Sequence, residues 1–371
     1  MSTRDVDATW LDDATDVTGA ADALIRERLW GAALDGDEYA AAATVFAAIE
    51  QGMAAEDVLL DVIAPVQHKV GTEWAANRIT VAQEHAATAI NDRVIAALAH
   101  HPAARPAPRA GRVTVACVDG EWHALPARLL AEVLRLRGWE IDFLGAQVPT
   151  PHLIAHLHHQ GPDAVALSCS IPTRLPTAHA AITACQAAGA PVLAGGAAFG
   201  PDGRYALQLG ANAWAPDARA AEQRLRRGFA RVSPAAAHQP IDDLPHLADQ
   251  EYTMVRDSAA RLIGTAMDDL DNRFPAMRDY SEQQRQHTVE DLAHIVEFLG
   301  TALYVDDDDL FTRFITWTAD ILTARGVPAA SLQPALESLA AQLHDHPRTQ
   351  RILRAAHTVL SPPATDPTRT A

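Results

Sequence analysis

The chain has 371 residues, and its 47 acidic side chains outnumber its 30 basic ones, giving a formal net charge of −17. A surface this acidic repels phosphate groups, so we expect neither nucleic acid nor a membrane as a direct partner. No apolar stretch approaches the ~20 residues of a bilayer span, and the N-terminus has no apolar signal core. The three cysteines (Cys117, Cys169 and Cys185) do not suggest a disulfide framework, so we expect a cytoplasmic protein.

The first hundred residues are typical of a small helical bundle. Residues 17–99 are rich in Ala, Leu and Glu, and apolar residues such as Leu24, Ile25 and Leu29 recur at helical spacing. The prolines within residues 100–111 cannot continue a helix, so this stretch is predicted to be a stiff linker. We therefore predict a helical domain over residues 1–101.

The next segment has a different pattern, in which short β-rich runs alternate with stretches of helical character. Strands that alternate with helices pair in parallel through right-handed crossovers, and near-continuous apolar strands indicate a sheet that is covered on both faces. We therefore predict a flavodoxin-like, doubly wound α/β domain over residues 111–232. Its strands are expected at residues 112–118, 140–146, 163–169, 190–196 and 211–215, with helices at 126–137 and 173–188 among the connections.

A second linker, rich in Pro, Ala and Asp, precedes a third segment that is helical again. The acidic run at residues 306–309 is expected to form a loop and helix N-cap, because it lacks the spaced ligands of a calcium loop. We predict an all-α domain over residues 247–360 and a mobile tail at 361–371. Its helices are expected at residues 256–270, 281–304, 310–325 and 331–343, with Gly326 and Pro328 as a stop signal after the third.

Candidate ligand-binding residues gather at the carboxyl ends of the predicted strands, which is where open α/β sheets bind ligands. His123 lies in the loop after the first strand, ahead of the helix that Pro126 begins. Ser168 and Ser170 end the third strand, and Gly195–Gly196 end the fourth. Small residues at neighbouring strand ends predict a slot in which a long ligand approaches the backbone.

These three features together resemble the cobalamin-binding signature Asp-x-His-x-x-Gly, Ser-x-Leu and Gly-Gly. The resemblance implies that His123 is the lower axial ligand of cobalt and that the slot takes the nucleotide tail of the corrinoid. The chain departs from the signature where Glu121 replaces Asp, Pro126 replaces the first Gly and Ser170 replaces Leu. Glu121 is expected to hydrogen-bond the imidazole and fix its tautomer, and its neighbour Trp122 is also assigned to the cofactor site.

The N-terminal helices resemble the helical cap of light-dependent cobalamin repressors, in which a Trp precedes a Glu-His pair by ten residues. Here these residues are Trp74 and Glu84–His85, and Val81 begins the helix that carries the pair. The resemblance implies that Trp74 covers the 5′-deoxyadenosyl group on the upper face and that the pair contacts this group. Ala75 stands where those repressors carry a histidine that binds cobalt after illumination, and His85 is the nearest substitute. Those repressors carry a DNA-binding domain before the cap, which we do not expect here.

One predicted helix of the third segment, at residues 281–304, carries a polar and aromatic stripe beside the apolar stripe that would form the core. The order of a cobalamin cap, a cobalamin domain and a globin-like helical module resembles the photocobilins, photoreceptors that bind adenosylcobalamin and a bilin such as biliverdin. The resemblance implies that the stripe and nearby arginines bind the pyrrole N–H groups and propionates, whereas the alternative is a solvated face. The bilin would be noncovalent because no cysteine follows Cys185. The stripe is formed by His287, Asp291, His294 and Phe298, and the arginines are Arg278 and Arg285.

The resemblances imply a non-enzymatic light sensor that uses adenosylcobalamin and a noncovalent bilin. Light would break the Co–C bond, the cap would rearrange, and the signal would pass through a changed homo-oligomer or a downstream signalling protein. Two alternatives stay open. One is a corrinoid methyl-carrier protein that serves a separate methyltransferase, and the other is a cobalamin-only photoreceptor whose C-terminal helices dimerise.

Overall fold

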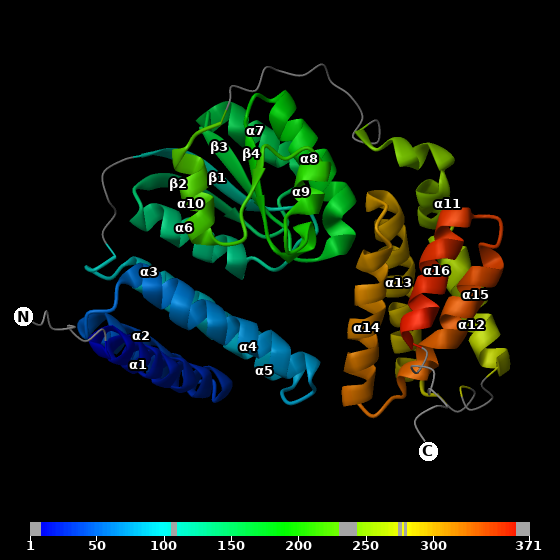
Figure 1. The fold of residues 1–371 in the computed structure, drawn as a ribbon, viewed down its shortest axis with the longest axis horizontal. Coiled ribbons are helices and arrows are strands. Elements are labelled where there is room, and N and C mark those ends of the chain that lie inside the picture. Colours follow the sequence, from blue (N-terminus) through cyan, green and yellow to red (C-terminus); the bar gives the residue numbers. More distant parts are fainter. Residues whose placement is uncertain (1–8, 105–109, 230–242, 274–276, 278–279, 361–371) are drawn as a thin grey trace, which may run out of the picture.

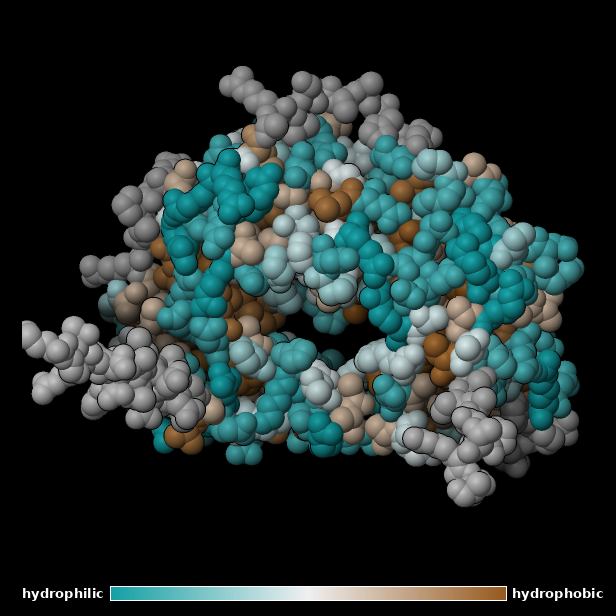
Figure 2. All heavy atoms as spheres, viewed as in Figure 1, coloured by the Kyte–Doolittle hydropathy of each residue, from teal (hydrophilic) through white to brown (hydrophobic). Residues whose placement is uncertain are grey.

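The computed structural model describes residues 9–104, 110–229, 243–273, 277 and 280–360, with side chains from residue 21 onward. Three parts follow one another along the chain: a cap of helices (residues 9–99), an α/β part (residues 110–229) and the C-terminal helices (residues 243–360) (Figure 1). The predicted tail at 361–371 lies outside the described residues, as does most of the second linker. The space-filling view shows an opening at the centre of the molecule, between the three parts (Figure 2).

The cap is a helical bundle, as the sequence predicts. Thr80 begins the last cap helix with a capping box, in which its hydroxyl accepts from the Gln83 N–H while the Gln83 side chain accepts from the Thr80 N–H. The helices pack around a buried cluster that includes Leu29, Val45 and Ile95. Their bounds are α1 (Thr9–Leu34), α2 (Glu38–Glu50), α3 (Ala55–Asp57), the π-helical turn η1 (Val58–Ile63), α4 (Ala64–Ala75) and α5 (Val81–Ala99).

The α/β part contains a five-stranded parallel sheet with strand order β2-β1-β3-β4-β5, which confirms the predicted flavodoxin-like fold. Buried residues of β1 and β3 pack on α6 and α10 on one face, while the other face packs on α7 and α8. The strands are β1 (Gly111–Cys117), β2 (Trp139–Gly145), β3 (Ala164–Ser168), β4 (Val192–Gly195) and β5 (Ala213–Trp214). The helices are α6 (Leu125–Leu136), α7 (Thr150–Gln160), η2 (Pro172–Arg174), α8 (Leu175–Ala187), η3 (Ala197–Phe199), α9 (Arg204–Gln208) and α10 (Ala218–Arg226).

The described C-terminal residues form an all-helical part, whereas the globin-like arrangement stays a prediction. The helix predicted at 256–270 is divided at Ser258 into two helices, and a final helix was not predicted. The acidic run does cap a helix, since the Asp307 side chain accepts from the Asp309 N–H at 2.9 Å. The elements are η5 (Pro245–Asp249), α11 (Glu251–Asp257), α12 (Ala259–Arg273), α13 (Glu282–Val305), α14 (Asp308–Ala324), η7 (Ala329–Leu332), α15 (Gln333–Gln342) and α16 (Pro347–Leu360).

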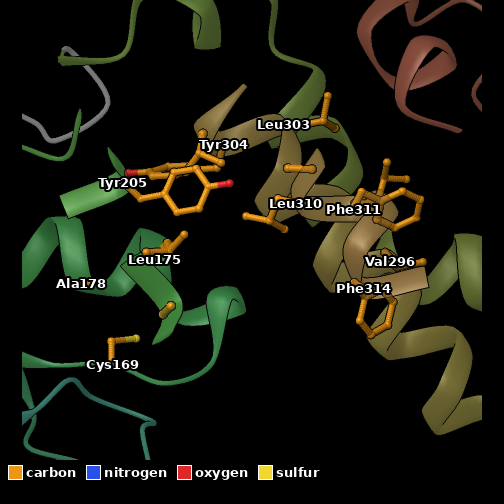
Figure 3. Close-up of a cluster of buried hydrophobic side chains, with 14 of the residues drawn as sticks. Cys169, Leu175, Ala178, Tyr205, Val296, Leu303, Tyr304, Leu310, Phe311 and Phe314 are labelled. Carbon is orange, nitrogen blue, oxygen red and sulfur yellow. The ribbon is translucent and has the colours of Figure 1, made fainter. Parts of the chain in front are cut away.

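The α/β part and the C-terminal helices share one buried hydrophobic cluster. Leu175 of α8 and Phe311 of α14 belong to this cluster, which Figure 3 shows in close-up. Polar contacts reinforce the same junction: buried His179 lies 2.9 Å from the Tyr304 hydroxyl, and the Tyr205 hydroxyl donates to Asp307 at 2.6 Å. The cap instead packs on the α/β part through a separate cluster. That cluster joins cap residues to Leu125, Leu129 and Val133 of α6, so the α/β part shares a buried core with both of its neighbours.

The three cysteines are free, in line with the expectation of no disulfide framework, and all three are buried. Burial raises the pKa of the Cys117 and Cys185 thiols to about 12, which leaves them unreactive as nucleophiles. Within the part of the chain that the structure describes, none of the helices has both the length and the apolarity that a bilayer crossing requires.

Candidate functional site

The loop after β1 carries a histidine that two hydrogen bonds join to a buried carboxylate. The main-chain N–H of His123 donates to Glu121 Oε1 at 2.8 Å, and ring Nδ1 of His123 lies 2.6 Å from the same oxygen. Because Nδ1 is held in this way, Nε2 is the ring nitrogen that remains available to an external partner. The His123 side chain is 57% exposed, whereas the Glu121 side chain is fully buried. This geometry suits a metal ligand with a fixed tautomer.

Glu121 also ties the loop after β1 to the loop after β3. Its second oxygen, Oε2, accepts from the Ser170 N–H at 2.6 Å and from the Ile171 N–H at 3.0 Å. Sequence reasoning expected Ser170 at the end of the third strand, but β3 ends at Ser168. After Ser168 the Cys169 N–H still donates to the Gly195 carbonyl, and the next two N–H groups turn toward Glu121. Ser170 therefore contacts this site through its backbone, and Ile171 was not predicted at all.

The hydrogen bonds set the charges of this pair. Burial opposes ionisation of Glu121, but the bonds from His123, Ser170 and Ile171 outweigh it and lower the pKa of Glu121 to about 2. The hydrogen bond to Glu121 raises the pKa of His123, burial lowers it, and the charges of Glu121 and Glu84 raise it further. Glu84 belongs to α5, so the cap presents a carboxylate toward the His123 loop.

A cavity of about 220 Å³ lies at the carboxyl edge of the sheet, where the sequence predicts a slot. Gly196 explains part of its shape, because its φ is +100° and a Cβ there would lie 2.3 Å from the carbonyl oxygen of Cys169. Two cap residues, Leu60 and Ala64, close one side of the cavity, which no sequence signal indicated. The other lining residues are Pro126, Ala127, Leu129, Leu130, Leu167, Ser168, Leu193, Ala194, Gly195, Gly196, Ala215, Pro216, Asp217, Ala218 and Ala221.

The cap residues of the predicted site lie around the turn between α4 and α5. Trp74 is in the last turn of α4 and is half-buried, while Val81 begins α5 and is 54% exposed. Glu84 contacts the ring of His85 and accepts from the Thr88 hydroxyl at 3.0 Å, which holds its carboxylate in place. The 72% exposed side chain of Trp122 follows Glu121 in the loop after β1.

The polar stripe predicted on the third segment lies on α13, but Arg285, one of the two arginines assigned to it, is not free. Arg285 forms an ion pair with Asp271 at 2.5 Å and donates to the Met277 carbonyl, which argues against it as a ready propionate partner. Arg278 lies outside the described residues. His287 Nδ1 lies 3.4 Å from Glu290 Oε2, and burial raises the pKa of Asp291. His294 is exposed on the same helix.

The aromatic end of that stripe lines a second cavity, of about 310 Å³, between the α/β part and the C-terminal helices. Phe298 and Phe314 stack there with ring centroids 3.8 Å apart and an interplanar angle of 6°. Trp317 lies beside them and is 48% exposed. The remaining lining residues are Ile171, Pro172, Ala197, Ala198, Gly200, Pro201, Tyr205, Leu310 and Arg313. Residues at the end of β3 and in the loop after it line both cavities, Ser168 the first and Ile171 and Pro172 the second.

The donor set limits what a metal could be at His123. Among the described residues, no three His, Cys, Asp or Glu side chains come together as a metal site. A metal at Nε2 would therefore have to arrive with most of its ligands already attached. The residues present fit such a group, because a single available imidazole nitrogen shares the carboxyl edge of the sheet with a cavity lined by aliphatic and small side chains.

Comparison with known proteins agrees with this class of site. A family described as "B12 binding domain" matches residues 111–225, and a second family of the same description matches residues 25–99. The chain thus carries B12-binding domains over the cap and the α/β part.

Among curated proteins, two repressors of Myxococcus xanthus are similar to this chain. The "HTH-type transcriptional repressor CarA" is 31% identical over 146 residues, which are 39% of this chain and 47% of CarA. The "HTH-type transcriptional repressor CarH" is 33% identical over 143 residues, which are 37% of this chain and 46% of CarH. The matches thus cover about half the length of these relatives. Among solved structures, the Methanosarcina barkeri monomethylamine corrinoid protein aligns with 55% of this chain and 97% of its own, at 19% identity and a TM-score of 0.45.

Proposed function

We propose that this protein is a light sensor that binds adenosylcobalamin between its cap and its α/β part. The observation that carries the proposal is the His123–Glu121 pair, whose available Nε2 shares one sheet edge with a cavity and lies within the electrostatic influence of Glu84 of the cap. The similarity to the CarA and CarH repressors supports a regulatory role over an enzymatic one. The adenosyl form of the cofactor is proposed because Trp74 and Glu84–His85 resemble the cap motif of light-dependent cobalamin repressors.

Each part of the proposed site has its own task. His123 would ligate cobalt from below, while Glu121 holds its tautomer and increases the basicity of Nε2. The cavity lined by Ser168 and Gly195–Gly196 would take the nucleotide tail, because aliphatic walls and a close backbone suit a flat, partly apolar group. Trp74 and Glu84 would cover the upper face, where an aromatic ring and a carboxylate suit a nucleoside.

When bound, adenosylcobalamin supplies a cobalt–carbon bond that visible light breaks. Trp74 and Glu84 would contact the adenosyl group only while it is in place, so the cap has different partners before and after illumination. A difference in contacts of this kind is what shifts a conformational equilibrium. The cap would then change its packing on α6, and with it the assembly of copies or the docking of a downstream protein. With Ala75 in place of a histidine, His85 is the cap residue that would offer an imidazole to the cofactor after illumination.

We also propose that a bilin binds noncovalently beside the C-terminal helices. The support is the cavity lined by Phe298, Phe314 and Trp317, since stacked aromatic side chains suit a planar conjugated ligand. Asp291 and His294 continue from Phe298 along α13 and offer partners for pyrrole N–H groups. Because the Arg285 guanidinium already pairs with Asp271, Arg313 of the cavity lining is the better-placed partner for a propionate.

The proposal is tested by adding adenosylcobalamin, methylcobalamin and biliverdin separately to the full chain in the dark. We expect tighter binding of the adenosyl form than of the methyl form, and a change in elution volume after green light. Biliverdin should add absorption in the red, and Trp317→Ala should weaken that binding. Tighter binding of methylcobalamin, with no effect of light on elution, would instead support a corrinoid methyl carrier. Cobalamin binding without biliverdin uptake would leave a cobalamin-only sensor.

A further inference from the structure

The C-terminal end of α14 contacts the cap at the turn between α4 and α5. The guanidinium carbon of Arg325 lies 5.5 Å from the centre of the Trp74 ring, which is within the range of a cation–π interaction. One residue earlier, the Ala324 carbonyl accepts a hydrogen bond from Asn77 Nδ2 at 3.4 Å. Figure 1 shows the α4–α5 turn reaching toward this end of α14. Residues that are about 250 positions apart in the chain thus meet here.

The opposite end of α14 is fixed to the α/β part. The Tyr205 hydroxyl of α9 donates to Asp307 Oδ2 at 2.6 Å, and Arg204 lies 3.1 Å from the same oxygen. Arg313, in the second turn of α14, donates to the Tyr205 hydroxyl at 3.1 Å. The 17 residues of α14 span about 26 Å at 1.5 Å per residue. A rigid helix therefore connects the α/β part with the tip of the cap.

We propose that Arg325 is a positioning residue that holds Trp74 of the cap in place over the cofactor compartment. This inference rests on the proposed function, because Trp74 is the residue expected to cover the upper face of the cofactor. It adds that the C-terminal helices set the position of that residue through the end of α14. Anything that shifts α14 relative to the α/β part then changes how Trp74 covers the compartment.

The surroundings of Arg325 support a positioning role more than a purely stabilising one. Arg325 is exposed, so its contacts contribute little to the overall free energy of unfolding. Its charge also acts on Asp291 of α13, where it opposes the rise in pKa that burial causes. The guanidinium thus lies over an aromatic ring of the cap, while its charge acts on a carboxylate of the C-terminal helices. Gly326 follows Arg325 and has a φ of +79°, which ends the helix. The Arg325 backbone is therefore fixed at the C-cap of α14.

The contact is tested first without cofactor, by hydrogen–deuterium exchange on the full chain. Arg325→Ala should raise exchange of the amides in residues 75–80 about threefold, because one exposed cation–π contact is lost. Arg325→Lys should restore much of the protection, and Arg354→Ala, an exposed arginine of α16, is the matched control. Unchanged exchange in residues 75–80 of Arg325→Ala would overturn the proposal.

The positioning role is tested next, by a double-mutant cycle on adenosylcobalamin affinity. Arg325→Ala should weaken binding about threefold in the parent chain and have no effect in a Trp74→Leu background. Equal effects in both backgrounds would overturn the role of Arg325 while leaving cobalamin binding intact. If the parent chain does not bind adenosylcobalamin, the proposed function and the positioning role both fall, although the exchange experiment still reports whether the contact exists.

Discussion

At the scale of single residues, Glu121 fixes two loops with one buried carboxylate. It accepts hydrogen bonds from the His123 N–H, the His123 ring, the Ser170 N–H and the Ile171 N–H. A buried charge is tolerated only when it is compensated in this way, and each donor would lose its partner without it. Glu121 is therefore expected to matter both for the fold of the loops and for the tautomer of His123.

We expect Glu121→Gln to lower the free energy of unfolding by about 3 kcal/mol, because an amide cannot accept all of these hydrogen bonds. Urea unfolding at neutral pH measures this, with Glu297→Gln on the exposed face of α13 as control. A cost equal to that of the control would show that the loops do not depend on Glu121.

The same substitution gives a pH test with a fixed sign. The folded pKa of Glu121, about 2, lies below its ordinary value of 4.5, so its stabilisation is present above about pH 4.5. It is lost as the pH falls from there toward 2, since the unfolded chain takes up the proton first. Glu121→Gln should remove this component of acid destabilisation, so that the stability curves of the two proteins converge at low pH. Parallel curves would contradict the lowered pKa.

The hydrogen bond between Glu121 and the His123 ring could be predicted because both residues lie in a single loop. The sequence leaves their role in cofactor binding as a prediction. It did not reveal Ile171, whose part in the site is a backbone N–H that any residue could supply. It also did not reveal that Arg285 pairs with Asp271, since nothing in a sequence shows which of several carboxylates an arginine will meet. Site residues can thus be predicted from sequence where a local motif of residue types identifies them. They cannot be predicted where their part depends on tertiary contacts.

At the scale of elements, the two adjacent glycines at the end of β4 differ in the space available for a side chain. A Cβ at Gly196 would collide with the Cys169 backbone at 2.3 Å, and φ there is +100°. A Cβ at Gly195 would meet the Ala215 carbonyl at an ordinary 3.6 Å. The fold thus requires a glycine at position 196. Gly195 lines the cavity, but its surroundings leave room for a Cβ atom.

We expect Gly196→Ala to lower the free energy of unfolding by about 3 kcal/mol, because the backbone of the neighbouring loop must move. Gly195→Ala should cost no more than about 1 kcal/mol. Denaturant unfolding of both variants gives the comparison, and each serves as the other's control. Similar costs for the two would mean that the turn adjusts more freely than its geometry indicates.

Strands and long helices could be predicted because burial on both sheet faces, or on one helix face, leaves a strong periodic signal. The short helices α9 and α10 were missed, since five and nine residues give little periodicity and α10 is rich in arginine. The division at Ser258 was missed because apolar spacing continues across it. The π-helical turn at Val58–Ile63 has no sequence signature of its own.

At the scale of the whole molecule, ion pairs fix one end of the cap to α10. Arg219 lies 2.7 Å from Asp61, 2.9 Å from Asp57 and 3.3 Å from Glu56. The hydrogen bond to Asp61 is the main cause of its raised pKa. The contact made by Arg325 lies at the other end of the same helices. The cap is thus held at two ends, with the proposed cofactor compartment between them.

We expect Arg219→Ala to lower the free energy of unfolding by about 1 kcal/mol at low salt, and by less in 1 M NaCl, because the pairs are partly exposed. Small-angle scattering should also show a wider spread of cap positions. The matched control is Arg224→Ala on the same helix, whose guanidinium donates to the Gly228 carbonyl and lies over the Phe229 ring, both close by in the chain. A salt-independent effect would point to packing instead of charge.

The order of the three parts could be read from the sequence, but not how they pack. The core shared by α8 and α14 consists of apolar residues that would also be expected if each part formed a separate core. The spacing of these residues does not indicate whether the helix they pack against is near in the sequence or more than a hundred residues away.

The central claim is that the His123 imidazole binds cobalt from the loop after β1. The most direct measurement is the absorption spectrum and affinity of His123→Ala with adenosylcobalamin, beside His152→Ala on the exposed face of α7. We predict that His123→Ala keeps its unfolding midpoint, loses the spectrum of the histidine-ligated form and binds about tenfold more weakly or worse. The control should match the parent chain. A histidine-ligated spectrum that persists in His123→Ala would contradict the account.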